Sequence, residues 1–190
     1  AELIVQDAAR RFPERKLGIV RFGNVLDSSG SVVPLFREQI KNRQAITVTH
    51  PEITRYFMSI GEAARLVIQA GAMSKNGEVF LLDMGNPVRI RDLALQMIEL
   101  SGLVPEKDIP LQFTGLRPGE KLYEELLIDP AQSQSTRHPR IYSSEEPLHS
   151  TEVLQKGIQL LSEAISKRDI NSALESMKRL VPEYNPENGQ

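Results

Sequence analysis

The sequence offers few side chains at a spacing that could perform acid–base or nucleophilic chemistry. It contains no cysteine, which excludes a thiolate nucleophile and a thiolate metal site. His50, His138 and His149 are scattered, and none has the spacing of a metal ligand. The serines within residues 28–31 lack the G-x-S-x-G surroundings of a nucleophile elbow and are typical of a turn. The remaining candidates are residues that could bind a charged ligand.

The segment FGNVLDSSGSVVPLF, residues 22–36, places a glycine and a polar loop between a short apolar strand and the start of a helix. This arrangement presents backbone N–H groups to an anion. Asn24, at the exit of the strand, could donate to a phosphate oxygen or stabilise only its own turn. The residues alone leave both interpretations open.

Two arginines stand where the guanidinium group would be held in place. Arg55 lies between apolar extended residues in TRYFM, so it must pair with a carboxylate or with a bound phosphate. Arg117 precedes a Pro-Gly pair that fixes a tight turn, and Glu120 follows directly. This spacing could address a diphosphate and an adjacent ribose diol. It could equally form a helix-entry salt bridge with a capping carboxylate.

Composition indicates a globular chain without a nucleic-acid or metal partner. The 190 residues are 40% hydrophobic and 25% charged, and the net charge of −2 excludes a basic nucleic-acid footprint. No apolar run approaches the roughly 20 residues that cross a bilayer. The chain begins Ala1-Glu2-Leu3 without a signal-peptide pattern or an initiator methionine, so we expect a chain cut from something longer.

Alternating helix and strand patterns predict an α/β fold for residues 1–128. On the helix at 60–73 the residues expected to face inward are Ala64, Val67, Ile68 and Gly71. Apolar periodicity, Gly and Pro predict helices at 1–12, 33–41, 60–73, 90–101 and 119–127, and strands at 17–22, 45–49, 56–58, 79–82 and 111–113.

The C-terminal part of the sequence has a different pattern. Residues 129–150 are polar and proline-containing, and are expected to form an irregular linker. Residues 151–182 are expected to form a helical hairpin whose second helix is capped by Asp169. Residues 183–190 are expected to form a tail.

Four stretches together resemble the polysaccharide-biosynthesis nucleotide-sugar 4,6-dehydratases, which are extended short-chain dehydrogenase/reductase proteins. The resemblance runs from Ala1 to about Pro186 and implies the C-terminal part of a Rossmann-type fold with a C-terminal helical hairpin. That hairpin resembles the one in the long, membrane-anchored members. The stretches are VRFGNVLDSSGSVVPLF, ITVTHPEITRYFMSIGEAARLVIQAGAM, EVFLLDMGNPVRIRDLA and FTGLRPGEKLYEELL.

The resemblance implies a UDP-N-acetylglucosamine 4,6-dehydratase of capsule, O-antigen or glycan biosynthesis. NAD or NADP, held mainly by an N-terminal Rossmann half, would take hydride from C4 and return it to C6 after water is lost across C5 and C6. In this chain it implies diphosphate contacts from Asn24, Arg55 and Arg117, ribose contacts from Glu120, a nucleotide pocket lined by Val32, Val33 and Phe36, and a nicotinamide contact from Phe22 and Gly23.

The sequence departs from this family in three respects. It has no Gly-rich cofactor loop. The family's catalytic segment has a Tyr or Met followed by Lys four residues later, and no Tyr or Met in this sequence has Lys at that spacing. We therefore expect Ala1 to lie just after the catalytic Lys, and this chain alone to contain no catalytic residue and to be inactive. Asp27 stands where the family has Gly.

Two alternatives share the same binding residues: a nucleotide-sugar 4-epimerase, and a non-catalytic module that binds a nucleotide sugar. The resemblance implies a homo-oligomer in the full-length protein, and a cytoplasmic location at the inner face of the membrane through an upstream anchor. Because a partial sheet exposes an edge, we expect the chain alone to be marginally stable or to self-associate.

Overall fold

The structure is a computed structural model that describes residues 1–124, 133–146, 148–182 and 184. Its helices are α1 (Glu2–Arg11), α2 (Val32–Lys41), α3 (Ile60–Met73), α4 (Ile90–Leu100), α5 (Thr151–Ser166) and α6 (Ile170–Leu180). Its strands are β1 (Ile19–Arg21), β2 (Asn24–Val25), β3 (Ile46–Val48), β4 (Thr54–Arg55), β5 (Phe57–Met58), β6 (Val79–Leu82), β7 (Val88–Arg89), β8 (Leu111–Phe113), β9 (Ser133–Ser135) and β10 (Ile141–Ser144).

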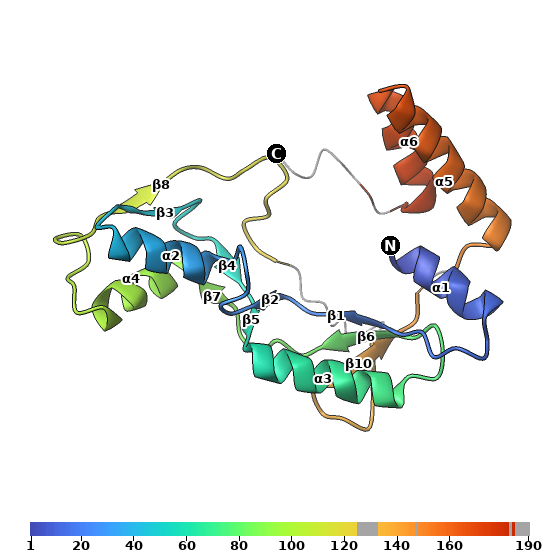
Figure 1. Cartoon of the computed structure of the whole chain (residues 1–190), viewed down its shortest axis with the longest axis horizontal. Coiled ribbons are helices and arrows are strands. Elements are labelled where there is room, and N and C mark those ends of the chain that lie inside the picture. Colours follow the sequence, from blue (N-terminus) through green and yellow to red (C-terminus); the bar gives the residue numbers. More distant parts are fainter. Residues whose placement is uncertain (125–132, 147, 183, 185–190) are drawn as a thin grey trace.

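A four-stranded sheet with the order β1-β6-β10-β9 forms the middle of the molecule, and α3 lies along it (Figure 1). β1 and β6 are parallel, and β10 is antiparallel to both β6 and β9. All four residues of β6 are buried, as the unbroken apolar run VFLL predicts. Small and apolar residues of α3 pack against Phe80, Leu82 and Ile141.

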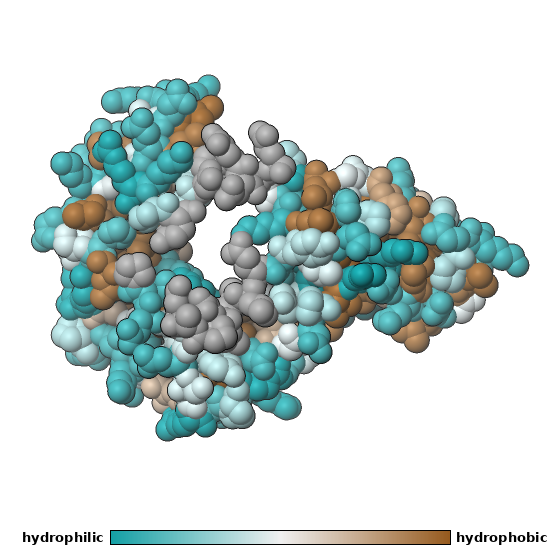
Figure 2. Space-filling model, turned by 180° about the vertical axis from the view of Figure 1, so that it is seen from behind, coloured by the Kyte–Doolittle hydropathy of each residue, from teal (hydrophilic) through white to brown (hydrophobic). Residues whose placement is uncertain are grey.

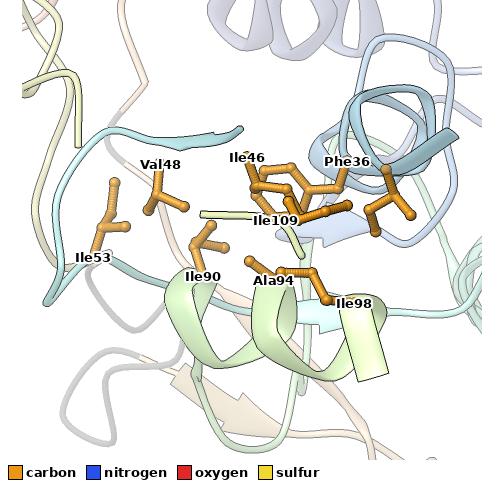
Figure 3. Close-up of a cluster of buried hydrophobic side chains, with 9 residues drawn as sticks. Phe36, Ile46, Val48, Ile53, Ile90, Ala94, Ile98 and Ile109 are labelled. Atoms are coloured by element: carbon orange, nitrogen blue, oxygen red, sulfur yellow. The ribbon is translucent and has the colours of Figure 1, made fainter. Parts of the chain in front are cut away.

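A second lobe contains α2, α4 and the parallel pair β3–β8 (Figure 1). Its core is a cluster of buried side chains between the two helices and the strands (Figure 3). The short pairs β2–β5 and β4–β7 lie between this lobe and the sheet. The core cluster comprises Phe36, Ile40, Ile46, Val48, Ile53, Ile90, Ala94, Ile98 and Ile109.

The α/β class and the C-terminal helical hairpin are confirmed. α5 and α6 pack closely because Gly157 has no side chain, and a Cβ there would lie 2.4 Å from Leu180 Cδ2. Asp169 caps α6 as predicted, since its carboxylate accepts from the Ser172 backbone N–H at 3.1 Å. Of the expected tail, only residue 184 lies within the described residues.

The predicted inward face of α3 is wrong. Ala63, Leu66 and Ala70 are buried, whereas the expected residues lie on the exposed side and Ile68 is 70% exposed. Apolar residues occur on all sides of this helix, so periodicity alone could not choose the face that packs on the sheet. Apolar side chains accordingly reach the surface among hydrophilic ones (Figure 2).

The predicted helix at 119–127 is also wrong over its described part, residues 119–124, which follow a turn at Gly119 with irregular backbone. Gly119 has a φ of 79°, and the Thr54 N–H donates to the Leu122 carbonyl at 3.2 Å. These tertiary hydrogen bonds hold the backbone out of a helix. Residues 125–127 lie outside the described residues.

The expectation of an irregular linker over 129–150 is wrong, because this segment contains β9 and β10. β10 completes the sheet by pairing with β6, and Ile141 is fully buried there. The polar composition concealed a strand pair because three of the four β10 residues are only partly buried. Within the part of the chain that the structure describes, no helix is long and apolar enough to span a membrane.

The first helix contacts the hairpin through a buried carboxylate. Asp7 accepts a hydrogen bond from the Thr151 hydroxyl and forms an ion pair with Arg11 at 2.8 Å. Arg10 donates to the His149 carbonyl. The hydrogen bond from Thr151, followed by the charges of Arg11 and Arg10, holds the pKa of the Asp7 carboxyl below its ordinary value of 3.8.

Phe36→Ala is expected to lower the free energy of unfolding by about 3–5 kcal/mol, because Phe36 is 0% exposed at the centre of the core cluster. Phe36→Leu fills most of the same space and should cost under about 1.5 kcal/mol. Leu100→Ala, at a residue that is 88% exposed, is the control and should stay within about 0.5 kcal/mol. Denaturant unfolding measures all three, and equal costs for Phe36→Ala and Leu100→Ala would contradict the core assignment.

Acid is expected to weaken the contact between α1 and the hairpin. Because the folded state lowers the pKa of Asp7, its stabilising contribution is present above 3.8 and is lost as the pH falls through the folded value. The melting temperature of the wild type should therefore fall more steeply than that of Asp7→Asn between about pH 5 and pH 3. Thermal melts followed by circular dichroism test this, and parallel slopes would rule it out.

Candidate functional site

A cavity of about 720 Å³ lies where the second lobe meets β2 and β4. Its walls come from the loop before α2, the end of β3, the strand β4 and the segment 114–120. Of the residues that the sequence singled out for ligand binding, this cavity is lined by Asn24, Val32, Arg55, Arg117 and Glu120. The two arginines therefore share one hollow.

The N-terminus of α2 opens into this cavity. Gly30, Ser31 and Val32 line it, and the N-cap residue Ser31 makes no side-chain capping hydrogen bond. Its hydroxyl is buried without a hydrogen-bond partner among the described residues. Because the first N–H groups of a helix lack intrahelical partners, these groups can receive an anion, as the sequence predicted.

The loop that leads into α2 turns at Asp27, which has a φ of 60°. This is a left-handed conformation that glycine adopts freely and that aspartate also tolerates. Asp27 also forms an ion pair with Arg37 of α2 at 2.9 Å. The exchange of Gly for Asp is therefore compatible with the turn that the site requires.

Arg55 is held by protein groups on three sides. Its Nη2 donates to Glu120 at 3.4 Å, its Nη1 donates to the Thr54 carbonyl at 2.7 Å, and its Nε forms an ion pair with Glu124 at 3.5 Å. The guanidinium side chain is 16% exposed, and the two hydrogen bonds use two of its five N–H donors. The carboxylate pairing that its apolar surroundings suggested is thus present, and the remaining donors can meet an anion in the cavity.

Glu120 connects three elements at the cavity wall. Its Oε1 accepts from the Thr49 hydroxyl at 3.1 Å and from Arg55, and its Oε2 accepts from the Arg117 backbone N–H at 3.0 Å. Glu120 therefore stabilises the Arg117 turn directly and does not cap a helix. The Arg117 residue itself is exposed at the mouth of the cavity.

Glu124 belongs to the same network but was missed by sequence reasoning. One carboxylate oxygen accepts from Asn24 Nδ2 at 3.3 Å, and the other accepts from the Tyr56 backbone N–H at 3.3 Å. Asn24 Nδ2 also donates to the Tyr56 carbonyl at 3.3 Å. Both amide hydrogens of Asn24 thus have protein partners, which leaves its Oδ1 to meet a ligand. Glu124 lies in the segment KLYEELL, close to Glu120, but the helix expected there gave no reason to place its side chain beside Asn24 or Arg55.

Four other predicted site residues lie away from this cavity. The Phe36 side chain belongs to the core, and Val33 lines a second, apolar cavity of about 570 Å³ between α2 and α4. Gly23 faces protein, since a Cβ there would lie 3.3 Å from Met84 Cε and from Tyr56. Phe22 is partly exposed outside the cavity. Their direct contacts with substrate or cofactor stay predictions. The described residues contain no cluster of metal-ligating side chains.

Comparison with known proteins points to one family. A family described as "Polysaccharide biosynthesis protein" matches residues 1–146. The capsular polysaccharide biosynthesis protein CapD of Staphylococcus aureus is 58% identical over 127 residues, which cover 67% of this chain and 21% of CapD. The UDP-glucose 4-epimerase of Rickettsia felis is 39% identical over 114 residues, which cover 60% of this chain and 32% of the epimerase. The chain thus spans between a fifth and a third of the length of these relatives.

Two solved structures resemble the fold. Pen from Bacillus thuringiensis has a TM-score of 0.67 and 36% identity, over 78% of this chain and 46% of Pen. DesIV, a dTDP-glucose 4,6-dehydratase from Streptomyces venezuelae with NAD and TYD bound, has a TM-score of 0.56 and 17% identity, over 65% of this chain and 39% of DesIV. The expected Rossmann-type fold of the extended short-chain dehydrogenases is confirmed.

Arg55→Gln is expected to weaken the binding of inorganic pyrophosphate about tenfold or more, because a hydrogen bond to a charged group contributes about 1.5–3 kcal/mol. Arg15→Gln is the matched control, since the Arg15 side chain is 72% exposed and does not line the cavity. Isothermal titration calorimetry measures both. An equal loss of affinity in the two variants would show that the site is not in the cavity beside Arg55.

Proposed function

The chain belongs to the polysaccharide biosynthesis protein family, and we propose that its larger cavity binds the UDP part of a nucleotide sugar. The observation that carries this proposal is the shared cavity of Arg55, Arg117, Glu120 and the open N-terminus of α2. Positive charge, unpaired N–H donors and one carboxylate in a single hollow suit a diphosphate with an adjacent diol.

Each group has a distinct proposed role. Arg55 and Arg117 bind the diphosphate oxygens, together with the first N–H groups of α2. Glu120 exchanges its present contacts for the ribose hydroxyls. Asn24, whose amide hydrogens are engaged by Tyr56 and Glu124, offers Oδ1 as an acceptor for a ligand hydroxyl, and reaches a phosphate only by releasing one of those bonds.

For the complete natural protein we propose a UDP-N-acetylglucosamine 4,6-dehydratase, a lyase. The conversion needs a hydride acceptor, a base and the substrate in one geometry, and the described residues contribute the binding of the substrate. Support comes from the family match and from the fold shared with DesIV. The implied homo-oligomer and the membrane-proximal location of the complete protein stay predictions.

The described residues contain no loop that could bind the phosphates of a nicotinamide dinucleotide. The sequence has no Gly-rich phosphate loop, and the close packing of Gly23 against Tyr56 and Met84 accounts for that glycine. An NAD or NADP site of the complete protein would belong to the part of the relatives that this chain does not cover.

A second candidate is a nucleotide-sugar 4-epimerase, which the similarity to the Rickettsia felis enzyme favours. Both activities need the same diphosphate binding, so the cavity alone does not distinguish them. A non-catalytic module that binds a nucleotide sugar would also use the same diphosphate-binding cavity.

The products formed from UDP-N-acetylglucosamine by the full-length natural protein test these alternatives. A dehydratase yields a 4-keto-6-deoxy sugar that is lighter by one water, whereas an epimerase yields an isomer of unchanged mass. Mass spectrometry and NMR identify both. Recovery of unaltered, bound substrate would indicate a binding module.

Arg117→Ala is expected to raise KM for the nucleotide sugar about tenfold with little change in kcat. The reason is that Arg117 contacts the diphosphate equally in the ground state and the transition state. Steady-state kinetics measure the two parameters, and the exposed Arg15→Ala serves as the control. A fall in kcat with constant KM would contradict the proposed role.

A further inference from the structure

We propose that Glu124 is a positioning residue for the diphosphate site. Its carboxylate holds the Arg55 and Asn24 side chains in the orientation in which they bind the ligand. This inference rests on the proposed function of the larger cavity. Glu124 itself is absent from the residues that line the cavity, so it acts through its two neighbours.

The contacts of Glu124 join two separate strand pairs. Asn24 belongs to β2, Arg55 ends β4, and one carboxylate oxygen of Glu124 contacts both, at 3.3 Å to Asn24 Nδ2 and 3.5 Å to Arg55 Nε. The second oxygen accepts from the Tyr56 N–H at 3.3 Å, just before β5. A single side chain therefore fixes the amide and the guanidinium relative to each other and to the backbone beneath them.

These contacts decide which donors face the cavity. Glu124 forms an ion pair with the Nε of Arg55, while Nη1 and Nη2 each use one N–H for Thr54 and Glu120 and keep one N–H. These two remaining N–H groups can bind two oxygens of a phosphate side by side. It also takes one amide hydrogen of Asn24, which fixes the orientation of the amide plane. Without Glu124 both side chains gain alternative rotamers, and the ligand must order them on binding.

The sign of the effect separates positioning from simple charge. Glu124 is a second carboxylate near an anion site, beside Glu120, so its charge alone opposes the binding of a diphosphate. If charge were its only contribution, neutralising it would tighten UDP binding. If it positions Arg55 and Asn24, the same neutral substitution weakens UDP binding despite removing a negative charge.

The test compares UDP and uridine binding to the full-length natural protein as wild type, Glu124→Gln, Glu124→Ala and Glu99→Gln. Glu99→Gln is the matched control, because Glu99 is exposed on α4. We expect the two Glu124 variants to bind UDP about tenfold more weakly, with uridine affinity changed less than twofold and with the control unchanged. Calorimetry measures UDP, and ligand-observed NMR measures uridine.

The outcomes are separable. UDP binding by Glu124→Gln that equals or exceeds the wild type would overturn the positioning role while leaving the proposed function standing. Equal loss of UDP and uridine would assign Glu124 a general structural role and would also overturn it. Failure of the wild type to bind UDP would refute the proposed function itself, and the inference with it. A selective loss of UDP supports the inference, and Glu124→Gln, which keeps the side-chain shape, provides the result if Glu124→Ala does not fold.

Discussion

The site depends on one constraint, which is that a largely buried guanidinium must be paired. Arg55 satisfies it with Glu120, Glu124 and the Thr54 carbonyl. Removing the carboxylates would leave a charge without compensation in a poorly solvated position, and such a loss is strongly destabilising. The pairing therefore ties the segment that carries both glutamates to β4. This tie sets one wall of the cavity and places the Arg117 turn at its mouth.

The part of the cavity wall that α2 provides is held in place for a different reason. The N-terminus of α2 is fixed because Phe36 and Ile40 of the same helix are part of the core cluster with β3 and α4 (Figure 3). A close-packed core resists displacement. The helix end can thus present unpaired N–H groups at a defined position without being distorted by the ligand. The arginine wall is held by ion pairs, whereas the helix wall is held by packing.

Local sequence patterns were sufficient where one short-range effect dominates. The Asp169 cap formed as expected, since it depends on a few adjacent residues. Patterns failed where distant partners compete. The 119–124 segment lost its expected helix to hydrogen bonds from Thr54 and to the carboxylate contacts of Glu120 and Glu124. The strand β10 forms because its backbone pairs with the edge of β6, and its own sequence pattern did not predict it.

The sequence by itself determined the α/β class and the positions of most helices. It singled out Arg55, Arg117 and Glu120 as candidates, because guanidinium and carboxylate groups beside tight turns suit a diphosphate, and these three residues line one cavity. The tertiary structure alone decided that Phe36 belongs to the core, that α3 buries the face with Ala63, Leu66 and Ala70, and that Glu124 contacts Asn24 and Arg55. Those assignments depend on which surfaces meet after folding, and residues as far apart as 24 and 124 carry no local signal of their contact.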